Sequence, residues 1–121
     1  MVFNKDFPIY QQIMEILKQR ILNQEIKPGE LVPSVRMLAI EFGITTNTVQ
    51  RAYTEMVRDN LLKPVRGLGN RVTDDNRRLS KFRKNYYDEN IKKFYSKLKK
   101  TGIQDEDFLN LIQDFVKNIK K

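Results

Sequence analysis

The sequence predicts a mainly α-helical fold in which three helices and a two-stranded hairpin are followed by two more helices. Three observations lead to it. Apolar residues recur every three or four positions in five segments, and helix-start and helix-stop residues separate those segments. A glycine-bearing turn joins two short extended runs between the third and fourth segments. The length of 121 residues suits one domain, or a small domain with an appendage.

The first helix is expected within residues 7–23. Pro8 fits a first turn, because the N–H that proline lacks would have no partner there. The residues 27–30, Lys-Pro-Gly-Glu, are typical of a turn and end this helix, and Leu31 and Val32 follow as a short extended piece. The apolar positions with helical spacing are Ile9, Ile13, Ile16, Leu17 and Ile21.

A second helix is expected to begin after Ser34, whose hydroxyl can accept a hydrogen bond from a free backbone N–H of the first turn. Gly43 is expected to end it, since glycine adopts the positive φ of that position without strain. Ile44 then fills the turn. The predicted buried residues of this helix are Val35, Leu38, Ala39 and Phe42.

Thr45 is the expected N-cap of a third helix, and Asn60, which tolerates the left-handed conformation, is expected to end it. Residues 61–65 and 70–73 follow as the strands of a hairpin, with the turn at 66–69. Pro64 predicts that its nitrogen points away from the strand pairing. The inward face of the third helix is predicted to comprise Val49, Ala52, Tyr53, Met56 and Val57.

The polar segment 74–78 lacks periodicity and predicts a boundary. We therefore expect two domains, 7–75 and 76–121. A fourth helix should end at Thr101 and Gly102, and acidic residues at 105–107 suit the first turn of a fifth helix. The apolar positions of the fourth helix are Phe82, Tyr86, Tyr87, Ile91, Phe94, Tyr95 and Leu98, and those of the fifth are Phe108, Leu111, Ile112, Phe115, Val116 and Ile119.

This order of elements is that of a winged helix-turn-helix with a two-helix tail. The composition excludes several other classes. Without cysteine or histidine, the chain has no disulfides and lacks the usual ligands of zinc fingers and haem and the usual parts of catalytic triads. No cofactor, metal site or catalytic residue is expected. No apolar run approaches the roughly 20 residues that span a bilayer, and no signal peptide is visible, which predicts a cytoplasmic, nucleoid-associated protein.

The net charge of +8 is concentrated in the predicted tail. Up to Asp75 there are 10 basic and 9 acidic residues, and from Asn76 onward there are 13 basic and 6 acidic residues. A basic surface suits a polyanion such as DNA. A lysine-rich, solvated helix face explains the same count equally well, so charge by itself does not decide the function.

The start of the third helix carries a run of Thr and Asn, which are poor helix formers. A helix that enters the major groove needs small polar side chains there, because asparagine and glutamine can bond adenine and threonine can contact a thymine methyl or a phosphate. An ordinary polar helix face is the alternative. The DNA-contacting candidates of this helix are Thr45, Thr46, Asn47, Thr48, Gln50 and Arg51.

Two further groups of residues suit phosphate contacts. Ser34 and Arg36 open the second helix, whose free N–H groups favour an anion. The hairpin turn has a glycine at two positions, which lets its backbone approach DNA closely, and arginine on both sides. A plain cap and an ordinary hairpin are the alternatives. The candidates in the turn are Arg66, Gly67, Gly69 and Asn70, followed by Arg71.

Four blocks of the sequence together resemble the GntR family of bacterial transcription regulators. They are Pro-Ile-Tyr-Gln-Gln-Ile at 8–13, the segment from Lys-Pro-Gly-Glu to Leu-Ala at 27–39, Asn-Thr-Val-Gln-Arg-Ala-Tyr at 47–53, and Arg-Gly-Leu-Gly at 66–69. The short two-helix tail is similar to that of the YtrA branch. The resemblance covers about residues 7–75, and the remainder is too short for the large effector domains of most GntR branches.

The resemblance implies that Ser34 and Arg36 contact DNA and that the wing glycines Gly67 and Gly69 lie in the minor groove. It also implies that residues 45–48 and Gln50 touch DNA from the third helix. Many family members have arginine at the positions of Thr46 and Gln50. We therefore expect readout to depend more on Asn47, Gln50 and Arg36. Asn70 and Arg71 replace a common Thr-Phe pair, which adds a phosphate donor.

The apolar surface of the two tail helices exceeds what they can bury against each other, so the tail is predicted to form a homodimer, as the resemblance also implies. Packing against the chain's own winged helix is the alternative. A twofold dimer would read an inverted repeat in double-stranded DNA. The residues expected at the dimer contact are Phe82, Tyr86, Phe94, Tyr95, Leu98, Phe108, Leu111, Ile112 and Phe115. The outer lysines, expected to attract DNA, are Lys92, Lys93, Lys97, Lys99 and Lys100.

The sequence thus predicts a dimeric repressor of an operon, of the transporter type that the resemblance implies, with no effector identified. The principal alternative is a non-specific basic module that binds nucleic acid or a membrane surface. Only the basic fourth helix supports this alternative. An RNA-binding winged helix would expose stacking aromatics, whereas Tyr53 falls on the buried stripe. An enzyme is disfavoured because the acidic residues are scattered and lysine is the only available base.

Overall fold

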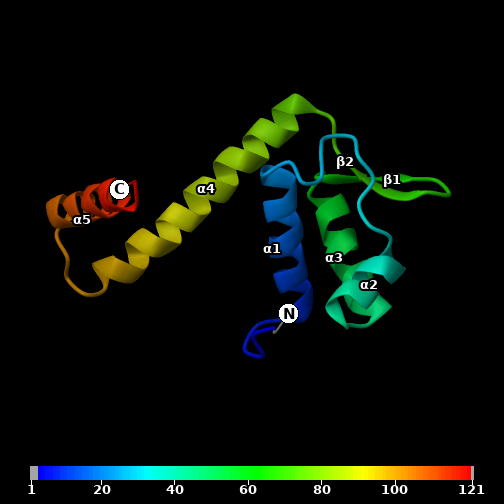
Figure 1. The fold of residues 1–121 in the computed structure, drawn as a ribbon, viewed down its shortest axis with the longest axis horizontal. Helices are drawn as coiled ribbons and strands as arrows, with labels where there is room; N and C mark the ends of the chain where they lie inside the picture. Colours follow the sequence, from blue (N-terminus) through cyan, green and yellow to red (C-terminus); the bar gives the residue numbers. More distant parts are fainter. Residues whose placement is uncertain (1–2, 121) are drawn as a thin grey trace. The chain divides into compact units, whose positions relative to one another are not determined.

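The computed structural model describes residues 3–120, and its order of elements confirms the predicted fold (Figure 1). Three helices precede a two-stranded antiparallel sheet, and two helices follow it. The elements are α1 (Ile9–Leu22), α2 (Val35–Phe42), α3 (Thr46–Arg58), β1 (Leu62–Val65), β2 (Gly69–Val72), α4 (Asn76–Lys99) and α5 (Asp105–Ile119).

The core of the winged helix lies where α1 and α2 pack against α3. Ile13 and Leu17 of α1 are fully buried, as are Val49 and Met56 of α3. Burial of such side chains is the main contribution to the stability of a small domain. The predicted stripes of the three helices are confirmed except at Ile9, which is 39% exposed. Ile16, Val35 and Val57 are half-buried at the edge of the core.

The helix ends are those that the sequence predicts. The hydroxyl of Ser34 accepts a hydrogen bond from the N–H of Met37 at 3.1 Å. Gly43 ends α2 in the left-handed conformation, with φ of 65°. Asn60, with φ of 62°, takes the same conformation after α3. Gly43, together with the N-cap Thr45 of α3, therefore fixes the short turn between α2 and α3.

The wing is a hairpin in which Leu62 pairs with Val72 and Val65 with Gly69. The segment before α2 runs along the other edge of β2. The N–H of Gly29 donates to the carbonyl of Val72, and the N–H of Val32 to that of Asn70, both at 2.9 Å. β2 therefore pairs with β1 on one side and with the segment before α2 on the other. β1, which contains Pro64, lies at the edge of the sheet.

The tail consists of α5 packed on the C-terminal half of α4. The buried ring of Phe108 lies 5.6 Å from the ring of Phe94 and 5.3 Å from that of Tyr95. Asp105, in the first turn of α5, accepts hydrogen bonds from the Tyr95 hydroxyl at 2.8 Å and the Lys99 ammonium at 3.0 Å. One ring and one carboxylate therefore join the two helices.

The chain divides into two compact units between Arg83 and Lys84, within α4. The helix begins at Asn76, the predicted first residue of the tail, but its first turns belong to the winged-helix unit. Leu79 and Phe82 pack against the core of that unit. The first turns of α4 therefore pack with the winged-helix unit.

Candidate nucleic-acid interface

The solvent face of α3 carries the central candidates. Its opposite face is buried: Val49, Ala52 and Met56 have no exposed surface. At 100° per residue, Asn47, Gln50, Arg51 and one further residue, Thr54, lie on the side away from that core. Burial on one side therefore fixes which polar groups the helix presents to a partner.

The four polar residues at the start of α3 differ in what they already bind. The Thr45 hydroxyl oxygen accepts the N–H of Thr48 at 3.3 Å and lies 2.9 Å from the Thr48 hydroxyl, so these two side chains form the cap of the helix. Thr46 and Asn47 are exposed, and within residues 3–120 neither side chain makes a hydrogen bond. Thr46 and Asn47 are thus the two that stay available to bases.

Gln50 and Arg51 are both exposed, but their side chains have partners. The Gln50 amide donates to the Thr54 hydroxyl at 3.4 Å, a long hydrogen bond that extends the polar surface one turn further. The Arg51 guanidinium lies 3.9 Å from the centre of the Tyr10 ring of α1. An arginine stacked on a ring in this way keeps its N–H edges free for acceptors. Tyr10 therefore positions Arg51.

The start of α2 is tied to α3 by Tyr53. Its hydroxyl donates to the carbonyl of Pro33, the residue before Ser34. Burial raises the pKa of Tyr53, and thus keeps the hydroxyl protonated and able to donate. Because Ser34 follows directly, this bond sets the N-terminus of α2 relative to α3.

The N-terminus of α2 has groups suited to an anion. The Ser34 hydroxyl and carbonyl are used by Met37 and Leu38, so the backbone N–H groups of Val35 and Arg36 are left without partners in the described chain. Arg36 is exposed and forms no ion pair with a described carboxylate. A cationic side chain and free N–H groups at one place favour a phosphate.

The turn of the wing depends on its glycines. Gly67 has φ of 77° and Gly69 has φ of 105°, which other residues adopt only with strain. A Cβ at either position would meet no atom within 4 Å, so backbone conformation and not crowding requires glycine. Arg66 is exposed beside the turn, and Asn70 is half-buried at the start of β2.

Sequence patterns did not single out three residues of this surface. Thr54 could have been found from its spacing, four residues after Gln50 on the same face. Leu68, at the wing tip, leaves 66% of its surface exposed, and its apolar character did not suggest a contact. The stacking of Tyr10 on Arg51 joins residues of two different helices, and no local pattern indicates it.

Of the residues predicted at the dimer contact, some pack inside the chain and others are exposed. Phe108 is buried between the helices, and Phe82 packs on the winged-helix core instead of the tail. Phe94, Leu111 and Phe115 leave 48%, 58% and 66% of their surface exposed. Tyr86, Tyr95, Leu98 and Ile112 are half-buried. Five further large apolar residues are exposed here, namely Tyr87, Ile91, Leu109, Val116 and Ile119.

Lysines of the tail fall into two groups. Lys99, expected on the outer face, instead donates to the carboxylate of Asp105 and to the carbonyl of Ile103. The hydrogen bond from Lys99 lowers the pKa of Asp105, and the same bond raises the pKa of Lys99. Lys99 therefore joins α4 to α5 and does not belong with the other four outer lysines.

No helix among residues 3–120 combines the length and the apolar character needed to cross a bilayer. In the same residues, no three potential ligand side chains cluster in a way that could hold a metal ion.

Comparison with known proteins places this surface in a family. The model of the bacterial regulatory proteins of the gntR family matches residues 9–72, which span α1 to the wing. YhcF of Bacillus subtilis, an uncharacterized HTH-type transcriptional regulator, is 31% identical over 113 residues, which cover 93% of each chain. The repressor YtrA of the same organism is 38% identical over 68 residues, or 56% of this chain and 52% of YtrA. The match to YtrA therefore covers about half of each chain.

Solved structures agree with the fold. A GntR family transcriptional regulator from Listeria monocytogenes matches with a TM-score of 0.87 and 29% identity, over 93% of this chain and 98% of its own. The DNA-binding domain of AraR, solved in complex with an operator, matches with a TM-score of 0.56 and 27% identity, over 60% of this chain and 93% of that one. The chain belongs to the GntR family of bacterial regulatory proteins, which are helix-turn-helix transcription regulators.

Proposed function

We propose that this protein is a dimeric repressor that reads an inverted-repeat operator through α3 and the wing. The observation that carries the proposal is the exposed polar face of α3. Among residues 3–120, no group hydrogen-bonds to the side chains of Thr46 and Asn47, while the opposite face of the helix is buried. A helix with one anchored face and small polar residues at its N-terminal turns suits the major groove.

Base recognition is assigned to Asn47 and Gln50. Each amide carries one donor and one acceptor, the pair that adenine presents in the major groove. Gln50 exchanges its weak bond to Thr54 for one to a base. Thr46, beside Asn47, offers a methyl group and a hydroxyl, which suit a thymine methyl or a phosphate.

Phosphate contacts are assigned to the start of α2 and to the wing. Ser34 positions the free N–H groups of Val35 and Arg36, and the Arg36 guanidinium lies beside them in sequence. In the wing, Arg66 supplies charge, and the positive φ of Gly67 gives a turn without a side chain to hold the backbone away. Thr45 and Thr48 cap α3 and so support these groups, Asn70 offers its amide from the start of β2, and Arg51 acts from its place on Tyr10.

Dimerisation is assigned to the exposed apolar side of the tail. Phe94, Leu111 and Phe115 cannot all be left in water without cost, since each exposes about half or more of its surface. A second copy of the tail offers the same apolar surface, and a twofold contact buries both at once. The domains 7–75 and 76–121 then have separate tasks, DNA contact and assembly.

The repressor role is supported by relatives that are named repressors, among them YtrA and NagR of Bacillus subtilis. Control of a transporter-type operon is proposed only from the resemblance to the YtrA branch. The family regulates transcription, and we propose no enzymatic reaction for this chain. A cytoplasmic location follows from the DNA partner.

The direct test is selection of duplexes from a random pool by the purified full chain, followed by sequencing. We expect enrichment of one motif with twofold symmetry, because two α3 helices read two half-sites. An asymmetric motif would contradict the dimer arrangement. If no motif is enriched, the protein is instead a non-specific basic module that binds through the lysines of α4.

A further inference from the structure

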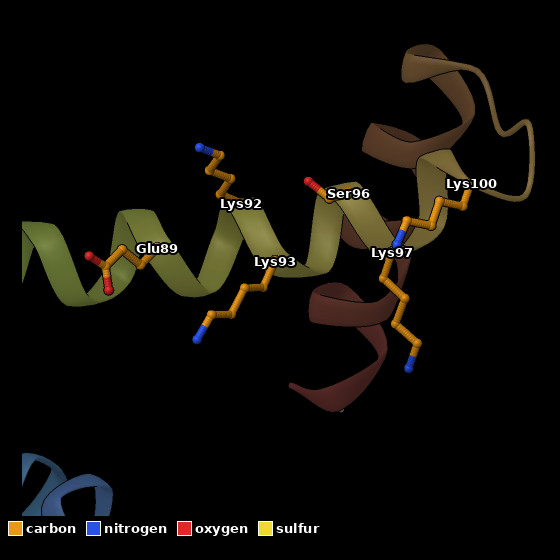
Figure 2. Close-up of a pocket in the computed structure, with 6 residues that line it drawn as sticks. All are labelled: Glu89, Lys92, Lys93, Ser96, Lys97 and Lys100. Atoms are coloured by element: carbon orange, nitrogen blue, oxygen red, sulfur yellow. The ribbon is translucent and has the colours of Figure 1, made fainter. Parts of the chain in front are cut away.

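Four lysines lie along the C-terminal half of α4, where Lys92 points to one side of the helix and Lys93 to the other (Figure 2). Lys92, Lys93, Lys97 and Lys100, together with Ser96 and Glu89, line a shallow pocket on the helix (Figure 2). We call these four residues the lysine stripe. Glu89, at its N-terminal end, is the one acidic residue among the six.

The lysine stripe lies on the side of α4 opposite its apolar face. At 100° per residue, the centre of the stripe lies about 150° away from the centre of Ile91, Phe94 and Leu98. The apolar side is the one on which α5 packs, through Phe108 against Phe94. Neither α5 nor a dimer formed through the apolar side therefore covers the lysine stripe.

The ammonium groups of the stripe are unneutralised. None of the four forms an ion pair with a described carboxylate. Two other lysines of α4 do form ion pairs, Lys84 with Asp88 and Lys99 with Asp105 of α5. Lys93 and Lys97 are four residues apart, and Lys97 and Lys100 three apart. Like charges at these spacings destabilise a helix. Binding of a polyanionic partner would relieve this repulsion.

The number of lysines in the stripe is close to the number of phosphates on one DNA strand over the same length. From Lys92 to Lys100 the helix rises about 12 Å, at about 1.5 Å per residue. One strand of B-DNA carries one phosphate per about 3.4 Å of axis, so that three or four phosphates fall within the same length. We propose that the lysine stripe is a second DNA-binding surface, which contacts backbone phosphates other than those reached by α3 and the wing. This inference rests on the proposed DNA-binding function.

A membrane surface is the competing partner of a basic amphipathic helix, because such a helix inserts its apolar side into the lipid. Here Phe108 of α5 occupies part of that side. DNA requires only the lysine side, which is open, and is therefore the partner that the contacts favour.

The test compares the full chain with K93Q/K97Q/K100Q on two duplexes, one from the region upstream of its own gene and one scrambled. A matched control, K5Q/K117Q/K120Q, removes the same number of charges from exposed lysines outside the stripe. Binding constants are measured by fluorescence anisotropy across a range of salt concentrations. Circular dichroism and sedimentation establish that the variants keep the fold and the assembly state.

The expected result is a shallower dependence of log K on log salt for the stripe variant on both duplexes, by about 2 to 3 per protomer at about 0.9 per lost phosphate contact. The ratio of affinities for the two duplexes should stay within about twofold, the control should keep the wild-type slope, and K93R/K97R/K100R should restore it. Equal slopes for the stripe variant and the control would overturn the proposal.

Two further outcomes separate this inference from the proposed function. If the wild type does not prefer the upstream duplex but the stripe variant still flattens the slope on the scrambled one, the stripe binds DNA and operator reading is wrong. If the slopes are unchanged and the variant instead loses co-sedimentation with vesicles of anionic phospholipid, the stripe binds membranes and the inference is overturned.

Discussion

At the start of α3, chemically similar side chains have different tasks because their hydrogen bonds differ. Thr45 and Thr48 bind each other and cap the helix, whereas Thr46 and Asn47 stay free. The cap of Thr45 could be predicted from the sequence, because a threonine before a helix has few other partners. That Thr48 is not free depends on the contact of its hydroxyl with that of Thr45. The spacing of the two residues in the sequence does not predict this contact.

Replacing Asn47 by alanine should remove base readout without loosening the fold. We expect Asn47→Ala to weaken binding of the selected duplex by about 5- to 150-fold, the value of one bidentate base contact of about 1–3 kcal/mol. Binding of a scrambled duplex should not change. Anisotropy on both duplexes measures the effect, with Thr48→Ala as the control that perturbs the cap; equal losses on both duplexes for Asn47→Ala would argue against base contact.

The Tyr10 ring should matter for DNA binding although it belongs to α1. Stacking of Arg51 on a ring at an exposed site is worth about 0.5–1 kcal/mol, so Tyr10→Leu should lower DNA affinity about two- to fivefold. Tyr10→Phe, which keeps the ring, should bind as the wild type does. If leucine and phenylalanine behave alike, the ring does not position Arg51.

At the scale of elements, the residues next to each helix end are enough to predict where the helices begin and end. Contacts between residues far apart in the chain are not predicted in this way. The capping roles of Gly43 and Ser34 could be predicted from the sequence, because a helix cap forms hydrogen bonds with residues only a few positions away. The pairing of Gly29 with Val72 joins residues far apart in the chain, so no local pattern predicts it. The packing of Phe82 on the winged-helix core is missed for the same reason, since its helical phase fits the tail equally well.

The junction of α4 and α5 should depend on pH through Asp105. Its carboxylate accepts bonds from Lys99 and Tyr95, which hold its pKa below the ordinary value. A lowered folded-state pKa contributes stability above the unfolded pKa of about 4, and this contribution is lost as the pH falls through the folded value. The pKa values of Lys99 and Tyr95 are raised by their bonds to Asp105, so the same contact is lost again as the pH rises through those values.

Thermal unfolding followed by circular dichroism between pH 2.5 and 7 tests this junction. Asp105→Asn should lose part of the decrease in melting temperature that the wild type shows on acidification, because asparagine does not titrate. The effect should be small, since these groups are exposed to solvent. Identical acid profiles for the two proteins would show that the junction adds nothing measurable.

At the scale of the whole molecule, each of the two units presents a surface that its own residues leave open. The winged-helix unit presents α3 and the wing, and the tail presents an apolar side that includes Leu111 and Phe115. Amphipathic periodicity predicted that excess of apolar surface. It could not divide the residues between internal packing and exposure, because Phe108 and Phe115 have the same helical phase, and their position along α5 decides which one meets α4.

A charge on the apolar side of the tail should prevent dimerisation. Phe115 is 66% exposed, so Phe115→Asp should cost the monomer little but should place a charge inside a twofold contact. We expect the variant to sediment at 14.4 kDa and the wild type at twice that mass. Asn110→Asp, on the opposite side of α5, is the matched control and should remain dimeric. Equal masses for wild type and Phe115→Asp would show that another surface holds the copies together.

Two copies of this chain should together read one DNA sequence. Sedimentation velocity of the protein with labelled DNA measures this assembly. The duplex from its own upstream region and a scrambled duplex are compared at two salt concentrations. We predict a complex of two protomers on the upstream duplex that persists at the higher salt concentration, while the scrambled complex dissociates, because phosphate contacts alone are salt-sensitive. A single bound protomer, or equal loss of both complexes, would contradict the account.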